Sequence, residues 1–162
     1  MSAASPEPWP GARSGAQPAV PPPAPIAVSV PAAGADTARR IAAAMAPLRP
    51  ALVLLFGMPA EGLPALGAAL RELLGEGCRV VGCSSVGEIG PAGYCARTVT
   101  ALGFPSASFR VGVCVLRDQA LVPVSEWMAT LRRFHADFRP DLRRSSFGVL
   151  LADALARQED VL

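Results

Sequence analysis

The side chains best suited to chemistry lie in one stretch, Val80 to Tyr94, which reads VVGCSSVGEIGPAGY. An apolar strand is predicted to run into a loop that contains glycines, two serines and one glutamate. In open α/β sheets, ligands bind just beyond the carboxyl ends of such strands. Glycines let the backbone approach a ligand closely, and Ser84 and Ser85 offer hydroxyls beside backbone N–H groups. Because Glu88 can accept a hydrogen bond from an amine, the loop is a candidate binding site.

The same loop also has a purely structural interpretation. A tight crossover between strands needs glycines as well, and serines in such loops often hydrogen-bond to their own backbone. The residue types alone leave both interpretations open.

Catalytic motifs are incomplete around this loop. A serine-hydrolase elbow requires Gly-x-Ser-x-Gly and a histidine base. Here the glycine after Ser84 comes one position late, Ser85 lacks the first glycine, and the only histidine, His135, falls on a predicted helix. No Lys-Ser/Thr pair follows the glycines as in a P-loop, and no Cys-x-x-Cys pair suggests zinc. We therefore predict no enzyme, no cofactor and no metal, with a thiol enzyme using Cys83 as an alternative.

Composition argues against nucleic acid and membrane partners. The net charge is +2, and all 15 basic residues are arginines that cluster only in pairs. Nucleic-acid binders usually show a basic stripe with interleaved aromatic residues. The longest strongly apolar run, residues 51–56, is too short to span a bilayer, and no secretion signal precedes it. We therefore expect a cytoplasmic protein with neither nucleic acid nor a membrane as its partner.

The N-terminal residues 1–25 differ in composition from the rest of the chain. They contain eight of the 17 prolines, separated mainly by alanine, glycine and serine. Such a segment buries too little apolar surface to offset the entropy lost on ordering. We predict a disordered tail, for which a proline-rich ligand of an SH3-type domain is a minor alternative.

From Ile26 onward, strand and helix signals alternate. Strands are predicted at residues 26–30, 51–56 and 79–83, and helices at residues 36–45 and 63–74. Asp36 suits the first N-cap, while Pro64 and Gly75 suit the two ends of the second helix. This β-α-β-α-β order favours parallel strands with right-handed crossovers.

The second half of the chain follows a different pattern. Residues 97–104 and 108–116 are strand-like, and the short connection between them predicts an antiparallel hairpin. A helix with an apolar stripe is expected from Ser125 to Phe138, followed by a buried strand at residues 147–151. The predicted fold class is therefore α/β, with helices packed on a mixed sheet.

The run Gly82-Cys83-Ser84-Ser85-Val86-Gly87-Glu88-Ile89 resembles the G-C-S-T-x-G-E-I signature of the FIST N-terminal domain. A glycine and an aromatic residue follow in the family pattern, here Gly93 and Tyr94, and a strand comes next. Ser85 replaces the usual threonine and keeps the hydroxyl. Since the order of elements also fits, the resemblance extends over about residues 26–160, and we expect residues 26–162 to form one FIST N-terminal-like domain.

The resemblance implies a sensory input domain of a signal-transduction protein that binds a small molecule, such as an amino acid. Its expected ligand-binding residues are Gly82, Ser84, Ser85, Gly87 and Glu88. The family pattern continues beyond Leu162 into a second glycine-rich segment and a C-terminal FIST domain. We therefore expect this domain to be incomplete at its C-terminus, with a C-terminal FIST domain or an output domain as partner. The alternatives are a truncated fragment and a non-catalytic interaction scaffold that uses the proline-rich tail and an exposed apolar surface.

Overall fold

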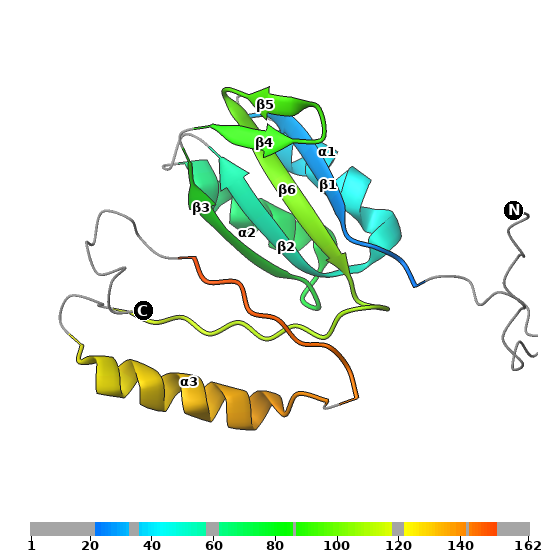
Figure 1. Cartoon of the computed structure of the whole chain (residues 1–162). Helices are drawn as coiled ribbons and strands as arrows, with labels where there is room; N and C mark the ends of the chain where they lie inside the picture. Colours follow the sequence, from blue (N-terminus) through cyan, green and yellow to red (C-terminus); the bar gives the residue numbers. More distant parts are fainter. Residues whose placement is uncertain are drawn as a thin grey trace, which may run out of the picture.

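A computed structural model of the chain describes residues 22–32, 36–57, 62–85, 87–117, 122–141 and 143–151. It contains a four-stranded sheet with two helices on one face, a small hairpin near one end of the strands, and a third helix beyond the other end (Figure 1). Most of the predicted tail lies outside the described residues, and residues 22–25 are exposed and without regular structure. None of the described helices is long and apolar enough to cross a membrane.

The main sheet is mixed, as predicted, and its strands lie in the order β1-β6-β2-β3. They are β1 (Ile26–Pro31), β2 (Pro50–Gly57), β3 (Arg79–Ser84) and β6 (Thr98–Pro105). Strands β2 and β3 are parallel, and β6 is antiparallel to both β1 and β2. The first three strands therefore point the same way, which agrees with the predicted β-α-β-α-β unit, and β6 lies between two of them.

Two helices cover one face of this sheet: α1 (Thr37–Met45), followed by the short helix η1 (Ala46–Leu48), and α2 (Leu63–Leu74). Pro64 lies in the first turn of α2, and Gly75 ends it at φ 84° with its N–H donated to the Arg71 carbonyl. Asp36 occupies the predicted N-cap position of α1, but its carboxylate does not cap the backbone. The carboxylate pairs instead with Arg39 at 3.1 Å. Local signals thus place both ends of α2 and the start of α1.

The core lies between these helices and the sheet. The apolar face of each helix meets alternate residues of β1, β2 and β6, as the 3.6-residue and two-residue periods require. Full burial of one such side chain contributes roughly 1.5–3 kcal/mol. The largest completely buried apolar side chains of this core are Ile41, Met45, Val53 and Leu70.

A second, two-stranded sheet stands where only a loop was expected. Strands β4 (Glu88–Gly90) and β5 (Gly93–Cys95) form an antiparallel hairpin. The hairpin crosses the sheet near β1 and β6, on the face opposite α1 and α2 (Figure 1). Gly90 lies directly against the Ser29 side chain, so the hairpin is packed onto the sheet.

The predicted hairpin between residues 97–104 and 108–116 is wrong. Strand β6 already has β2 on one edge and β1 on the other, so no edge remains for residues 108–116. The chain also turns away at once, because the N–H groups of Ser108 and Phe109 both donate to the Pro105 carbonyl. Within the described part of the chain, this segment is extended but forms no strand.

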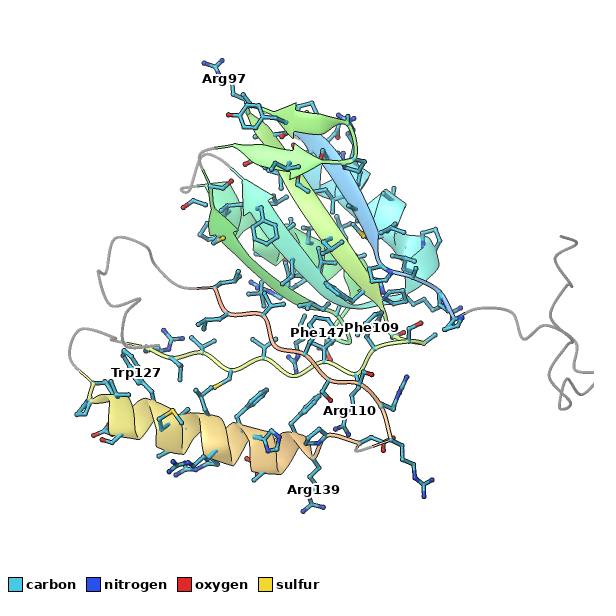
Figure 2. The ribbon with its side chains drawn as sticks, viewed as in Figure 1. Arg97, Phe109, Arg110, Trp127, Arg139 and Phe147 are labelled. Atoms are coloured by element: carbon cyan, nitrogen blue, oxygen red, sulfur yellow. The ribbon has the colours of Figure 1, made fainter. Side chains whose placement is uncertain are left out.

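The buried strand predicted at residues 147–151 is also wrong. These residues are extended, but they join no ladder among the described residues, and Phe147, Val149 and Leu150 are exposed. An apolar run predicts a buried strand only where a sheet neighbour and a covering layer exist. The Phe147 ring still anchors the segment, since it contacts the rings of Phe104 and Phe109 at centroid distances of 6.3 and 6.5 Å (Figure 2).

The third helix, α3 (Val124–Phe138), agrees closely with its prediction. It is fixed at its carboxyl end by Arg110, whose guanidinium donates to the carbonyls of Phe138 and Arg139 and lies 4.3 Å from the Phe138 ring centroid (Figure 2). A cation at this position also complements the negative end of the helix dipole. Arg110 thus ties α3 to the extended segment that follows β6.

The two leucines Leu70 and Leu73 of α2 provide a test of this core. Leu70 is completely buried, whereas 51% of Leu73 is exposed. We expect Leu70→Ala to lower the free energy of unfolding by about 2–5 kcal/mol, because it leaves a cavity in the core, and Leu73→Ala to lower it by less than about 1 kcal/mol. Urea unfolding followed by circular dichroism measures both, and equal losses would contradict the arrangement of α2 described above.

Candidate functional site

The signature loop begins at the carboxyl ends of two parallel strands, where ligands of α/β sheets bind. Ser84 is the last residue of β3, and it pairs with Gly57, the last residue of β2. The N–H of Ser85 donates to the Gly57 carbonyl at 3.3 Å, which holds the start of the loop against β2. The loop therefore lies at the carboxyl ends of β2 and β3, and its role as a binding site stays a prediction.

Glu88 is the centre of the polar contacts in this loop. It is the first residue of β4, and only 3% of it is exposed. Its Oε1 accepts a hydrogen bond from the Ser85 hydroxyl at 2.6 Å, and its Oε2 accepts one from the Thr98 hydroxyl at 3.1 Å. The carboxylate thereby joins the loop after β3 to the first residue of β6.

This carboxylate is buried, and no positive partner for it lies among the described residues. The only ion pair within the described residues joins Arg39 and Asp36 on the surface. A buried carboxylate is costly unless a charge or several hydrogen bonds compensate it. Two neutral hydroxyls use only part of the acceptor capacity of its two oxygens, so Glu88 could accept further donors.

Two predicted glycines have close neighbours within the protein itself. A Cβ on Gly82 would lie 2.5 Å from the carbonyl oxygen of Leu55 in β2, and one on Gly87 would lie 2.4 Å from the Tyr94 hydroxyl. Gly82 is therefore required for the close packing of β3 on β2, whereas the largely exposed Tyr94 side chain can move aside for a side chain at position 87. Gly82 is also exposed, so its packing role leaves one side open to solvent.

Of the five predicted site residues, the structure joins Ser85 and Glu88 directly. Ser84 is exposed, and its hydroxyl makes no hydrogen bond to the described residues. Val86, inside the signature, lies outside the described residues. The loop thus combines one exposed hydroxyl with a fixed, buried carboxylate.

Sequence reasoning missed the residues of the sheet that lie under the hairpin. Thr98 holds Glu88, and close by, the hydroxyls of Ser29 and Thr100 hydrogen-bond at 2.8 Å across β1 and β6. The available signal was a pair of threonines two positions apart in β6, Thr98 and Thr100, on the face opposite the core residues Val99 and Ala101. Polar residues on one face of a mainly apolar strand indicate that this face meets something polar.

The structure also places the residues considered for hydrolysis, thiol catalysis and metal binding. His135 is exposed on α3, which lies far from the hairpin in Figure 1. Cys83 is half-buried, near the end of β3 just before the loop. A different cysteine, Cys78, is buried, and burial raises the pKa of its thiol, which opposes formation of a thiolate at Cys78. No group of three or more His, Cys, Asp or Glu side chains within the described ranges is arranged to hold a metal.

Comparison with known proteins gives one match. The family model of the FIST N domain matches residues 51–162, which include the signature loop and more than half of the chain. The matched region begins at β2, so that β1 and α1 precede it. No curated protein and no solved structure matches the chain.

The two neighbouring serines of the loop should differ in their effect on stability. Ser85→Ala removes a donor to the buried Glu88, so we expect it to lower the free energy of unfolding by about 1.5–3 kcal/mol. Ser84→Ala changes an exposed hydroxyl and should cost less than about 0.5 kcal/mol. Chemical denaturation of the two variants at neutral pH makes the comparison, and a larger loss for Ser84→Ala would contradict the Glu88 contacts.

Gly82 should not tolerate a side chain. Its Cβ would overlap the Leu55 backbone, so Gly82→Ala should lower the free energy of unfolding by about 1–3 kcal/mol through a forced backbone shift. Gly77 is the matched control, because a Cβ there meets no atom within 4 Å, and Gly77→Ala should be neutral to slightly stabilising. Thermal unfolding of both variants decides the point. An unchanged Gly82→Ala protein would show that β2 and β3 are not so tightly apposed.

Proposed function

The chain belongs to the FIST N domain family, a family of sensory domains in signalling proteins, and we propose that it is a non-catalytic sensor that binds a small molecule at the loop after β3. In this proposal, residues 26–162 form the sensory unit, and Gly82, Ser84, Ser85, Gly87 and Glu88 form the binding loop. A C-terminal FIST domain or another output domain is the proposed partner. Four free cysteines are consistent with a reducing compartment such as the cytoplasm.

The observation that carries this proposal is the buried Glu88 carboxylate, for which the described part of the chain supplies no positive partner. A ligand with an ammonium group would supply that charge and use the free acceptor capacity of both oxygens. The exposed Ser84 hydroxyl, at the end of β3, is a donor for a carboxylate on the same ligand. An amino acid carries both groups, and we therefore propose an amino acid or a similar zwitterion as the ligand.

Access to Glu88 requires the hairpin to move, because the carboxylate is almost completely buried. The hairpin is a suitable mobile element, since each of its strands has only three residues. Short elements with few ladder bonds open at low free-energy cost. Ligand binding would then change the position of the hairpin, which is the change that a sensor passes to its partner.

A thermal-shift comparison tests the proposal. Each common amino acid is paired with the carboxylic acid that lacks its amine. A true ligand at about one hundred times its dissociation constant adds roughly 2.7 kcal/mol, which raises Tm by several degrees. We expect a shift with at least one amino acid and none with its amine-free analogue, and loss of the shift in Glu88→Gln.

Glu72→Gln, an exposed substitution on α2, is the control and should keep the full shift. Circular dichroism of ligand-free Glu88→Gln shows whether its fold is retained. Equal shifts with and without the amine, or an unchanged shift in a folded Glu88→Gln protein, would refute the role of this carboxylate.

A further inference from the structure

A second surface feature lies away from the signature loop, on the extended segments 109–117 and 145–151. Five large apolar side chains there are between 39% and 68% exposed. Apolar residues gathered in this way usually mark an interaction site. We call them the apolar strip, and they are Val113, Val115, Phe147, Val149 and Leu150.

The two segments begin side by side. Arg144 donates to the Ser108 carbonyl at 3.0 Å, and the Phe109 and Phe147 rings meet edge to face (Figure 2). Gly112 lies against the rings of Phe134 and Phe138, so α3 packs on one side of the first segment. The strip residues Val113 and Val115 follow Gly112 in the chain and are exposed.

The backbone of both segments also lacks partners. Among the described residues, neither 110–117 nor 145–151 makes a backbone–backbone hydrogen bond. Extended chain with free N–H and C=O groups is a template for another strand. Ladder bonds to such a strand give affinity, and alternate side chains give specificity.

Charge indicates which kind of strand fits. The described residues 108–117 and 143–151 include four arginines and no acidic residue, and none of these arginines forms an ion pair within the described part of the chain. A second copy would bring the same excess of positive charge against itself, which opposes self-pairing, whereas carboxylates would be attracted. The arginines are Arg110, Arg117, Arg143 and Arg144.

We propose that the apolar strip is the docking site for an extended strand of a partner protein in which apolar residues alternate with carboxylates. Its backbone pairs with residues 110–117 or 145–151, its apolar side chains cover the strip, and its carboxylates meet the arginines on and beside these two segments. The aromatic contact of Phe104 with Phe109 and Phe147 links this surface to β6.

The probe is a fluorescent nine-residue peptide of alternating glutamate and valine, and its matched control replaces every glutamate with lysine. We expect the acidic peptide to bind the full chain at least about ten-fold more tightly than the basic one at low salt. Hydrogen exchange should show new protection of amides in 110–117 or 145–151 on binding. Equal affinities, no binding, or binding without new protection in these segments would overturn the proposal.

Substitution of the strip separates docking from simple charge attraction. Val115→Glu and Val149→Glu, both at exposed positions, should each weaken the acidic peptide by at least about ten-fold. The control, Leu73→Glu on α2, adds the same charge at a similarly exposed leucine and should leave binding unchanged.

Equal weakening of peptide binding by all three variants would show that binding depends on net charge alone. Self-association that disappears in Val115→Glu would identify a second copy as the occupant. Either result overturns the proposal.

Discussion

The position of β6 between β1 and β2 is the constraint on which the rest of the structure depends. Its core face adds Val99 and Ala101 to the apolar layer under α1 and α2, so the core closes only when this strand has paired. Its opposite face presents Thr98 to Glu88 and Thr100 to Ser29. Because both of its edges are occupied, the chain beyond Pro105 has to leave the sheet, and the segments that lead to α3 and follow it lie outside the ladder.

Glu88 shows how one residue can serve both the fold and the proposed sensor. Its two oxygens hold the hydroxyls of Ser85 and Thr98, and these contacts keep the hairpin on the sheet. Hydroxyls offset only part of the cost of burying a charge. In the proposed function, an ammonium group that reaches the carboxylate acts on the same contacts that hold the hairpin. Binding and a change in hairpin position are then one event, which requires no second switch.

Much of the first half of the fold could be predicted because its signals are local. Pro64 and Gly75 mark the ends of α2 within one turn, and the apolar run of β2 specifies burial on both faces. The candidate loop could also be placed, since strand ends and glycines are visible in the sequence.

The pairing partner of each strand could not be predicted, because pairing joins residues far apart in the chain: Ser29 meets Thr100, and Phe104 meets Leu52. The apolar runs at 108–116 and 147–151 resemble buried strands for the same reason, since nothing local shows that neighbours are lacking. Thr98 was missed as a site residue because its role depends on the hairpin above it.

The two surfaces with proposed partners lie at opposite ends of β6, and this strand touches both. Thr98, its first residue, contacts Glu88, while Phe104, near its last, meets the Phe109 ring at 5.3 Å edge to face. Strand β6 is held in register by β1 on one edge and β2 on the other, so its two ends are rigidly connected. If a movement of the hairpin displaced Thr98 along the strand, Phe104 would therefore move as well. If the hydroxyl contacts of Glu88 absorbed that movement, Phe104 would keep its position. Thr98 is thus the residue through which the Glu88 carboxylate would couple the two surfaces, beside the contact of Gly90 with Ser29.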